Sequence, residues 1–341
     1  MSLLSVHSLM VDYQTASGTV HAVNDVSFNI APGETVGLVG ESGCGKSTLG
    51  KAIMRLVPAT DGRIYLEGKD ITRLKPAELR PVRSKMQMIF QDPMNSLNPR
   101  RTVGALIAQP LSVAGRSNAE IRDRVRELMQ QVGLPPDAAT RYPHEFSGGQ
   151  RQRIGIARAL ALNPKLVVCD EPVSALDVSI RAQVINLLQD LSDRLGISYL
   201  FISHDLTMVQ HIADRLLVMY LGRIVESGPA AQIWQRPAHP YTKALLSAAP
   251  VADPWEMRRR QRFVLQGDLP SPANLPPGCA FANSCPFATD HCRAERPNLR
   301  RDDDGRSLAC HYDLADRMAA GDIPGLQSPV PAAAEFQGAH P

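Results

Sequence analysis

The sequence lacks any apolar run that approaches the roughly 20 residues needed to cross a bilayer as a helix. Its first residues, Met1 to Met10, also lack the basic region and the following apolar segment that mark a secretory signal. Both absences predict a chain that is neither exported nor inserted in a membrane. If the chain serves a membrane process, we expect it to dock on other subunits.

The sequence also lacks an excess of charge of one sign, because 37 basic residues face 34 acidic ones and the formal net charge is +3. A protein dedicated to nucleic acid usually carries a larger basic surface. Charge therefore indicates no partner, and we expect no nucleic acid. With 341 residues, 44% hydrophobic and 21% charged, the chain has enough apolar material for one large domain and a smaller appendage.

Cysteine is scarce, with six residues, and Cys279, Cys285, Cys292 and Cys310 gather near the end of the chain. In a chain that is not exported, such a group suggests a metal site before it suggests disulfides. The spacing C-x5-C-x6-C-x17-C is looser than that of zinc-binding pairs, which favour C-x2-C. Four thiolates suit an iron–sulfur cluster or zinc equally, and four free thiols in an unstructured tail are the third interpretation.

Hydrophobic periodicity predicts three successive patterns along the chain. Apolar and polar residues alternate over about residues 1–30, which indicates an antiparallel sheet, and a short buried strand follows at Glu34–Gly40. From about 95 to 162 the pattern is that of inserted helices, and beyond it strands and helices alternate as in a parallel α/β sheet. We expect helices over 118–133, 149–162 and 178–194, strands over 166–169 and 199–202, and a hairpin over 216–226.

The segment Gly40-Glu-Ser-Gly-Cys-Gly-Lys-Ser47 fits G-x-x-x-x-G-K-S and lies between a predicted strand and a predicted helix. Its glycines let successive N–H groups curl round an anion at the start of a helix, so it predicts a phosphate-binding loop. Lys46 would reach the β- and γ-phosphates of ATP, and the Ser47 hydroxyl would bind Mg²⁺. The residues expected to bind nucleotide here are Gly40, Glu41, Ser42, Gly43, Cys44, Gly45, Lys46, Ser47 and Thr48.

The apolar stretch Leu166-Val-Val-Cys169 is followed by two carboxylates, Asp170 and Glu171. Acids at the end of a strand can be merely structural, but a phosphate loop in the same chain favours a catalytic pair. Asp170 would hold Mg²⁺, directly or through water, because this ion prefers hard oxygen ligands. Glu171 would accept the proton of the attacking water. The two motifs together predict an ATPase.

The segment Phe146-Ser-Gly-Gly-Gln150, followed by a predicted helix, resembles the signature motif of ABC ATPases, with Phe in place of the commoner Leu. Ser147 and the N–H groups of Gly148 and Gly149 would form a second anion cradle at a helix N-terminus. The motif lies about 20 residues before Asp170, and this position makes the match specific. Other family landmarks are Gln91 in Phe90-Gln-Asp-Pro93, Asp177 in Ser174-Ala-Leu-Asp177, and His204 in Ile202-Ser-His-Asp205.

The resemblance implies a role for each landmark. Gln91 would be a lid residue that senses Mg²⁺ and water, and His204 would contact the γ-phosphate. Asp177 would lie in the loop that crosses a dimer seam. The signature, with Ser147 and Gly149, would clamp the γ-phosphate held by a partner subunit, because it cannot face the phosphate loop of its own chain in this fold.

Three further stretches narrow the resemblance to the peptide-type importers, the oligopeptide, dipeptide and nickel group. They are Asn95-Ser-Leu-Asn-Pro-Arg100, His239-Pro-Tyr-Thr242, and the cysteine-bearing segment Gly278–Cys292. Glu171-Pro-Val-Ser-Ala-Leu-Asp177 and the Gly-Gln ending of the signature look like the second of the two ATPase subunits that these systems encode. In the resembling family the cysteine region carries a four-iron four-sulfur cluster, which we expect on the four cysteines, with Zn²⁺ as the alternative.

The resemblance implies a motor subunit that couples ATP binding and hydrolysis at a dimer interface to the uptake of peptides or similar small solutes. Its direct partners would be a second ABC ATPase subunit, in a heterodimer more readily than a homodimer, and two transmembrane permease subunits. An extracytoplasmic solute-binding protein would act indirectly. The chain would lie peripherally on the cytoplasmic side of the bacterial inner membrane. Nickel chelates, glutathione and short sugars stay open as solutes, because solute contacts belong to the other subunits.

The resemblance covers about residues 1–250 and implies an α/β fold. Its parts would be a RecA-like parallel-sheet ATPase core, an N-terminal antiparallel β subdomain and an inserted α-helical subdomain over about 95–162. Residues 251–321 would form a small cysteine-rich C-terminal extension, and residues 322–341, rich in Ala, Pro, Gly and Gln, a disordered tail. No internal repeat is visible, so one nucleotide-binding unit is expected.

Two other classes of function stay open at this point. Some ABC ATPases act on DNA or the ribosome, but these commonly contain long coiled coils, zinc modules or two nucleotide units in one chain, and none is visible. The cysteine-rich end could instead make the chain an iron–sulfur electron carrier under nucleotide control, although the hydrolytic motifs are all present. The adenine-stacking residue is open as well. The resemblance favours Tyr13, but a tyrosine in a strand is as often a packing residue.

Overall fold

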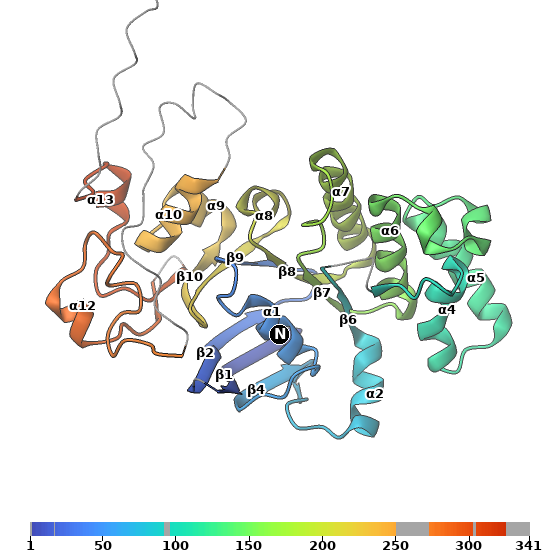
Figure 1. Cartoon of the computed structure of the whole chain (residues 1–341), viewed down its shortest axis with the longest axis horizontal. Coiled ribbons are helices and arrows are strands. Elements are labelled where there is room, and N and C mark those ends of the chain that lie inside the picture. The colour runs from blue at the N-terminus through green and yellow to red at the C-terminus, as the bar shows by residue number, and fades with distance from the viewer. Residues whose placement is uncertain (1, 17, 92–95, 250–272, 303–304, 325–341) are drawn as a thin grey trace, which may run out of the picture.

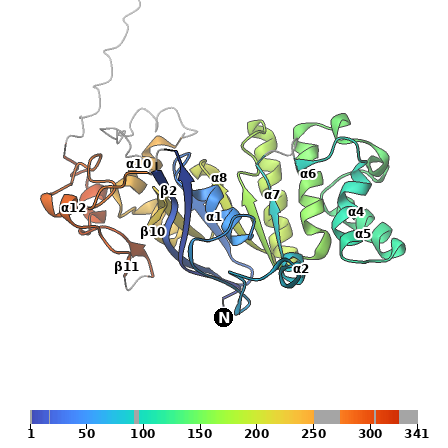
Figure 2. The ribbon, with the colours of Figure 1, turned by 60° about the horizontal axis from the view of Figure 1, so that its bottom comes forward.

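The structure is a computed structural model of the chain, and it describes residues 2–16, 18–91, 96–249, 273–302 and 305–324. Two β-sheets lie on either side of helix α1 (Lys46–Ile53), which contacts strands of both sheets (Figure 1). The helical insert and the C-terminal extension lie at opposite ends of the molecule (Figure 2). None of the helices among the described residues has the length and apolarity that a bilayer crossing requires.

The smaller sheet is antiparallel, as the alternation over residues 1–30 predicts, and its strand order is β2-β1-β4-β5. The alternation of buried and exposed residues along β1 is interrupted at a bulge. Ser8 has a positive φ of 42° there, and the register with β2 shifts between Val6 and Leu9. This bulge returns Leu9 to the buried cluster that contains Val6. The strands are β1 (Leu4–Thr15), β2 (Gly18–Ile30), β4 (Asp61–Leu66) and β5 (Lys69–Asp70).

The larger sheet has the strand order β11-β12-β10-β9-β3-β8-β7-β6. Strands β9, β3, β8, β7 and β6 pair in parallel, whereas β10, β12 and β11 pair antiparallel. The expected parallel sheet is therefore right for one part only, and the whole sheet is mixed. The bounds are β3 (Thr35–Val39), β6 (Met86–Ile89), β7 (Leu166–Asp170), β8 (Ser198–Ser203), β9 (Arg215–Tyr220), β10 (Arg223–Pro229), β11 (Arg300–Arg301) and β12 (Ser307–Leu308).

The reason for the mixed sheet is the length of one connection. The turn Leu221–Gly222 joins β9 to β10, and Tyr220 pairs with Arg223 across it. A turn this short permits only antiparallel pairing, whereas parallel strands need a long crossover. Both turn residues have positive φ angles, 42° at Leu221 and 81° at Gly222, which suits the twist of a tight hairpin.

Helices α7, α8, α9 and α10 cover the face of the larger sheet that is turned away from α1 (Figure 1). Helix α7 ends where Gly196 takes a φ of 65°, a left-handed conformation that commonly closes a helix. The bounds of these and the remaining helices are α2 (Pro76–Lys85), α7 (Val178–Leu195), α8 (Leu206–Ile212), α9 (Ala230–Gln235), α10 (Pro240–Ala248), α12 (Asp290–Ala294) and α13 (Ala315–Ala319).

The helical insert follows β6 and packs beside α7, as the helical pattern from about residue 95 predicts. Helix α5 begins with a capping box, in which the Ser117 hydroxyl accepts from the Glu120 N–H and the Glu120 carboxylate accepts from the Ser117 N–H. The elements of the insert are α4 (Val103–Val113), α5 (Asn118–Gln131), η1 (Pro136–Thr140), η2 (Pro143–Glu145), α6 (Gly148–Ala159) and η3 (Leu160–Leu162).

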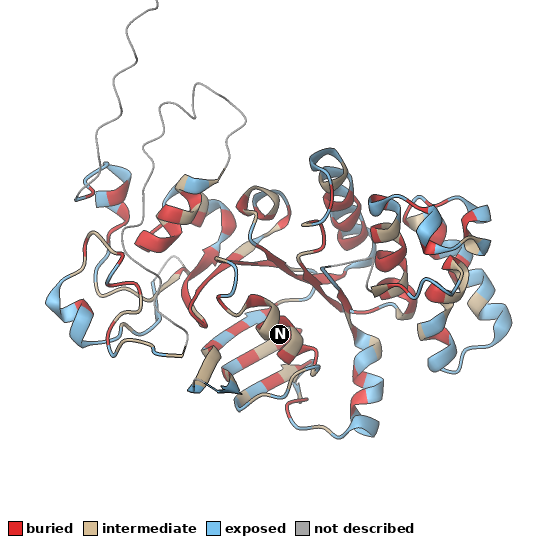
Figure 3. Ribbon diagram, viewed as in Figure 1, coloured by how far each residue is buried: buried red, intermediate tan, exposed pale blue. Residues whose placement is uncertain are grey.

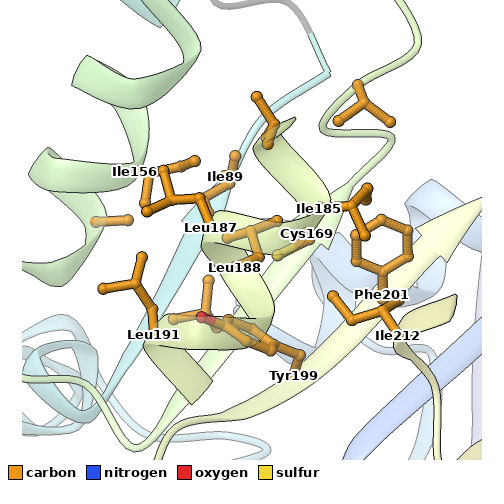
Figure 4. Packing of buried hydrophobic residues seen from close by; sticks show 14 of the residues in the cluster. Ile89, Ile156, Cys169, Ile185, Leu187, Leu188, Leu191, Tyr199, Phe201 and Ile212 are labelled. Atoms are coloured by element: carbon orange, nitrogen blue, oxygen red, sulfur yellow. The ribbon is translucent and has the colours of Figure 1, made fainter. Parts of the chain in front are cut away.

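The larger sheet separates two hydrophobic cores. Along β7, Leu166 and Val168 face the core shared with α1 and the smaller sheet, while Val167 and Cys169 face the core under α7. Every residue of β7 is buried, which is why the strand reads as a continuous apolar run (Figure 3). The second core joins Tyr199 and Phe201 of β8 to side chains of α7 and Ile156 of the insert (Figure 4).

The C-terminal extension is attached to the larger sheet. Strand β12 pairs with β10, where Leu308 lies opposite Glu226 and Ser307 opposite Ser227. The predicted start of the extension at residue 251 lies outside the described residues, as does most of the predicted tail over 322–341. The boundaries at 250 and 321 stay predictions.

Candidate active site

The phosphate loop joins β3 to α1. Gly40, Gly43 and Gly45 take positive φ angles of 154°, 81° and 106°, which residues with a Cβ rarely adopt. A Cβ on Gly45 would lie 2.0 Å from the Ala22 carbonyl oxygen, so only glycine lets the loop pass β2 this closely. The loop ends at the first turn of α1, where free N–H groups and the helix dipole favour binding of an anion.

The Lys46 side chain is 4% exposed and lies against the loop. Its ammonium group donates to the carbonyl oxygens of Gly40, at 2.8 Å, and Glu41, at 2.7 Å. These acceptors are uncharged, and no carboxylate of the described residues forms an ion pair with Lys46. The positive charge therefore remains available to attract phosphate oxygens.

Ser47 and Asp170 meet at the end of β7. The Ser47 hydroxyl, in the first turn of α1, donates to Asp170 Oδ1 at 2.7 Å. Burial raises the pKa of Asp170, while the hydrogen bond from Ser47 opposes this shift. A hydroxyl and a carboxyl group at one point supply the hard oxygen ligands that Mg²⁺ prefers, so the pair fits the predicted metal position.

Glu171 is held by two side chains that come from neighbouring strands. Its Oε2 accepts from Gln91 Nε2 at 2.9 Å, and its Oε1 lies 3.1 Å from His204 Nδ1. Gln91 follows β6 and His204 follows β8, on either side of β7, and the carboxyl ends of parallel strands meet at one sheet edge. Sequence motifs 80 residues apart are brought together in this way.

The Glu171 backbone is strained, because its φ of 47° is positive although it is not glycine. Its N–H donates to the Ile202 carbonyl oxygen at 3.0 Å, which ties the end of β7 to β8. Such strain is concentrated where the surrounding structure must direct a side chain to a functional position. The strand therefore ends in a turn that aims the carboxylate between Gln91 and His204.

Lys46, Ser47, Gln91, Glu171 and His204 line one cavity of about 480 Å³, a size suited to a small-molecule ligand, whereas Asp170 lies behind Ser47 and does not line it. Its walls come from the phosphate loop, from β2, from the turn after β9, and from the strand ends. The lining residues are Val20, His21, Ala22, Ser42, Gly43, Cys44, Gly45, Lys46, Ser47, Thr48, Gln91, Glu171, His204, Leu221 and Gly222.

Tyr13, the predicted adenine-stacking residue, is 39% exposed and is not among the residues that line this cavity. It lies opposite Val20, which does line it. The sequence reasoning missed His21, whose ring borders the cavity and whose Nδ1 lies 2.8 Å from Asp12 Oδ1. The only signal for His21 was its place among the alternating residues of the N-terminal sheet, near Val20 and Ala22.

The signature motif forms the start of α6. The Ser147 hydroxyl accepts from the Gln150 N–H at 3.3 Å, and the Gln150 side chain accepts from the Ser147 N–H at 3.0 Å. A Cβ on Gly149 would lie 2.4 Å from Ile180 Cγ2, so this glycine also permits close packing of α6 on α7. None of Ser147, Gly148, Gly149 and Gln150 is among the residues that line the phosphate-loop cavity.

Asp177 is the N-cap residue of α7 and is exposed, and the neighbouring Val178 side chain is 73% exposed. An exposed apolar residue at the start of a helix beside the signature is compatible with a surface that another subunit covers. The structure describes one chain, so the predicted dimer seam at Asp177 stays a prediction.

The four clustered cysteines line one small cavity of about 20 Å³, together with Phe281 and Phe287. Burial raises the pKa of Cys279 to about 11 and the pKa of Cys285 to about 12, so both thiols would have to lose protons to bind metal. Among the described residues, no three or more His, Cys, Asp or Glu side chains are arranged so that they could hold a metal ion. The donor set fits iron–sulfur or zinc chemistry, but the thiols would have to turn toward a common centre.

Comparison with known proteins decides the family. Residues 23–174 match the family described as "ABC transporter", and residues 225–292 match "Oligopeptide/dipeptide transporter, C-terminal region". The chain is 53% identical over 308 residues to the oligopeptide transport ATP-binding protein OppF of Escherichia coli, which covers 87% of this chain and 92% of that protein. The chain belongs to the ATP-binding proteins of the oligopeptide/dipeptide ABC transporter family. It is an ABC transporter ATPase, the motor subunit of a peptide-type importer.

Solved structures agree with this family. The chain is similar to cbiO1 from Clostridium perfringens, part of an ABC transporter complex, with a TM-score of 0.62, 29% identity, and coverage of 68% of this chain and 90% of that chain. It is also similar to a dimeric ATP-binding cassette in a post-hydrolysis state with ADP and phosphate, with a TM-score of 0.61, 29% identity, and coverage of 67% and 98%. Both support the mixed α/β ABC ATPase fold.

Proposed function

We propose that this ABC ATPase hydrolyses ATP at a site shared by two ATPase subunits and couples the reaction to the uptake of short peptides. The observation that carries the proposal is the convergence of Lys46, Glu171, Gln91 and His204 on one cavity, while the signature at Ser147 lies elsewhere. One half of a phosphate clamp is thus present at the cavity. The other half would come from a second subunit.

Each side chain of the site has a separate proposed role in ATP hydrolysis. Lys46 and the N–H groups at the start of α1 bind the phosphates, and Ser47 and Asp170 would hold Mg²⁺, which supplies charge stabilisation when bound. Glu171 accepts the proton of the attacking water. Gln91 and His204 contact its two carboxylate oxygens and fix its orientation. His204 would also contact the γ-phosphate.

The signature of the partner completes the clamp. Ser147 and Gly149, at the N-terminus of the twelve-residue helix α6, would offer a hydroxyl, N–H groups and the helix dipole to the γ-phosphate bound by the other subunit. Nucleotide then holds two subunits together, and hydrolysis removes that attraction. The solved relative that is dimeric with ADP and phosphate supports this arrangement.

The first test replaces Glu171 by Gln. General-base assistance is worth about 10²–10⁴ in rate, so we expect a loss of hydrolysis of this order with ATP binding retained. In size-exclusion chromatography with ATP and Mg²⁺, the variant should form a dimer, either alone or mixed with the second ATPase subunit, and the further change Ser147→Ala should weaken that dimer.

The control for this test is Asp193→Asn, an exposed acid in the last turn of α7 that does not line the cavity, which should hydrolyse ATP at the parental rate. Hydrolysis by Glu171→Gln near the parental rate would overturn the role given to Glu171. Absence of nucleotide-dependent association both with itself and with the second ATPase subunit would overturn the shared site.

Peptides are the proposed solute class. The Escherichia coli relative is named for oligopeptide transport, and residues 225–292 of this chain match the C-terminal region of oligopeptide/dipeptide transporters. Nickel chelates and glutathione are alternatives that the same motor would serve. The decisive measurement is stimulation of ATP hydrolysis in proteoliposomes that contain the ATPase subunits and the permeases, with the solute-binding protein loaded with a short peptide or with each alternative.

The proposed assembly contains a second, related ATPase subunit and two permease subunits on the cytoplasmic side of the inner membrane, with a solute-binding protein on the other side. A heterodimer is preferred to a homodimer because the chain resembles one member of a pair of ATPases. Co-purification from membranes separates the cases, since recovery of this chain as the sole ATPase would favour the homodimer. Recovery with nucleic acid instead of permeases would favour the rival function.

We infer that Cys279, Cys285, Cys292 and Cys310 hold a four-iron four-sulfur cluster with a structural role, and zinc is the alternative. Their shared cavity and the chemistry of four thiols support this, and a cluster would cross-link segments of the extension that lie up to 31 residues apart in sequence. Anaerobically purified protein should show iron and sulfide by analysis and a broad visible absorption. Cys285→Ser should lose both, while Cys169→Ala, which removes a cysteine of β7, should keep them. Stoichiometric zinc without sulfide would favour the alternative.

A further inference from the structure

Tyr241 of α10 contacts the phosphate loop although 200 residues separate them in sequence. Its side chain is 0% exposed, and its hydroxyl oxygen accepts a hydrogen bond from the Glu41 N–H at 2.9 Å. Glu41 is the second residue of the loop, directly after Gly40. The His239-Pro-Tyr-Thr242 motif, which the catalytic apparatus leaves unexplained, thus reaches the nucleotide site.

The Glu41 main chain is held on both sides. Its N–H is bound by Tyr241, and its carbonyl oxygen accepts from the Lys46 ammonium at 2.7 Å. Gly40, next to it, has a φ of 154° and would place a Cβ 2.2 Å from the Met219 carbonyl oxygen. The first turn of the loop therefore depends on contacts with elements outside the loop.

Tyr241 is itself fixed by an aromatic cluster, which comprises Tyr220, His239, Tyr241 and Phe281. The Tyr241 ring lies 4.6 Å from the Tyr220 ring and 5.7 Å from the Phe281 ring, measured between centroids. The Tyr241 N–H donates to His239 Nδ1 at 3.1 Å, and the His239 N–H donates to the buried Glu226 carboxylate at 3.0 Å. Rotation of the Tyr241 ring away from the loop would disturb its contacts with the Tyr220 and Phe281 rings.

Phe281 connects the cluster to the C-terminal extension. It lies between Cys279 and Cys285 in sequence, is 2% exposed, and also contacts the Tyr220 ring at 5.4 Å and the His239 ring at 5.6 Å. The extension therefore supplies one wall of the pocket that holds Tyr241. The phosphate loop is linked through two side chains, Tyr241 and Phe281, to the cysteine-bearing segment.

We propose that Tyr241 is a positioning residue of the nucleotide site, and that the C-terminal extension, through Phe281, holds it in place. The hydroxyl keeps the Glu41 N–H paired and so selects the loop conformation in which the N–H groups at the start of α1 point at the phosphates. The inference rests on the proposed function only in that this loop binds nucleotide. If it is right, the C-terminal extension increases the affinity of the site for nucleotide.

The expected effect follows from the loss of one hydrogen bond. Tyr241→Phe keeps the ring in the cluster but leaves the half-buried Glu41 N–H without its partner, which favours other loop conformations. When the competent conformation is only a fraction of the population, the apparent Kd rises by the inverse of that fraction. We expect a rise in the Kd for MgADP of roughly tenfold, the scale of one unpaired buried amide.

The cluster offers a matched control. The Tyr220 hydroxyl is buried and has no hydrogen-bond partner among the described residues. Tyr220→Phe therefore removes the same atom from the adjacent ring without breaking a contact, and it should leave the Kd for MgADP unchanged. Phe281→Leu, which keeps an apolar side chain but leaves Tyr241 less supported, should raise the Kd by a smaller factor than Tyr241→Phe.

The experiment titrates MgADP into the full chain by calorimetry, because ADP binds at the loop without the partner's signature or hydrolysis. The thermal midpoint and kcat at saturating ATP are measured alongside, and we expect KM for ATP to rise in Tyr241→Phe with kcat within about twofold of wild type. Equal Kd values for Tyr241→Phe and Tyr220→Phe would overturn the inference, as would a fall in kcat without a change in KM. Failure of the wild-type chain to bind MgADP would instead overturn the proposed function.

Discussion

At the scale of single residues, the site depends on side chains whose local conformation or protonation is unfavourable outside the fold. Glu171 has a positive φ, and Asp170 is a buried carboxyl group whose pKa is raised by burial. His239 is the clearest case away from the chemistry, because it is 2% exposed and burial lowers its pKa to about 3. The tertiary structure maintains these states, and each should respond to pH or substitution in a defined direction.

Acid should destabilise the chain through His239. The folded state keeps the ring neutral, so that Nδ1 can accept from the Tyr241 N–H, whereas the unfolded chain takes up a proton below a pKa of about 6.5. The His239 contribution to the free energy of unfolding is therefore full above pH 6.5 and is lost as the pH falls toward 3, by up to about 1.4 kcal/mol per pH unit. Urea unfolding at pH 7.5, 6.5 and 5.5 measures it.

The control is His239→Asn, whose side chain can still accept a hydrogen bond but does not titrate. Its stability should decline less steeply than that of the wild type between pH 6.5 and 5.5. The buried Glu226, which faces His239, works in the opposite sense, because its raised pKa gives stability that is lost as the pH rises through that value. Glu226 is present in both proteins, so parallel pH profiles would show that His239 is not the titrating group.

At the scale of elements, the signature motif has a packing role beside its predicted chemistry. Gly149 permits contact between α6 and α7, since a Cβ there would lie 2.4 Å from Ile180 Cγ2. Gly155, six residues later in the same helix, has no heavy atom within 4 Å of an added Cβ. Two glycines in one helix are therefore under different constraints, which the sequence does not distinguish.

This difference predicts opposite effects of alanine. Gly149→Ala forces Ile180 to move and should destabilise the chain by about 1–3 kcal/mol, with weaker nucleotide-dependent association, because the signature is displaced with α6. Gly155→Ala should stabilise it by roughly 0.5–1 kcal/mol, because alanine favours the helix. Denaturant unfolding of both variants tests this pair. A loss of stability in Gly155→Ala as large as that in Gly149→Ala would contradict the prediction.

At the scale of the whole molecule, the C-terminal extension shares the core of the ATPase. Strand β12 continues the larger sheet, and Phe281 belongs to the same hydrophobic cluster as residues of β8 and α7. Helix α1, whose first turn lines the nucleotide cavity, thus lies between a helical insert at one end of the molecule and an extension at the other (Figure 1). A structure in which both ends share a core should unfold as one unit.

Removal of the Phe281 ring tests whether the chain unfolds as one unit. Phe281→Ala should lower the free energy of unfolding by about 3–5 kcal/mol and shift the main calorimetric transition of the whole chain, because the cavity would open in the shared core. Leu299→Ala, in the same extension but 40% exposed, should change the midpoint by less than about 1 °C. If Phe281→Ala moved a small separate transition and left the main one in place, the extension would be an independent unit.

Local sequence signals predicted much of the fold and of the site. The phosphate loop, the strand before it, the hairpin at Leu221–Gly222 and helix α7 follow from patterns within short segments, because glycine geometry and apolar periodicity are local properties. The larger sheet was predicted as parallel, and β11 and β12 were missed, because strands of two residues carry no periodicity. His21 was missed as a cavity residue because strand register, which sets the direction of each side chain, is not visible in a single strand.

The sequence by itself determined the class of chemistry, ATP hydrolysis. The phosphate loop is recognisable from glycines at set positions, and Asp170 and Glu171 from their place directly after an apolar strand. Only the tertiary structure decided which groups meet: Gln91 and His204 on Glu171, Tyr241 on Glu41, and Phe281 on Tyr241. The physical reason is that these contacts join residues 33 to 200 positions apart. Their geometry comes from strand order and core packing, which no local pattern encodes.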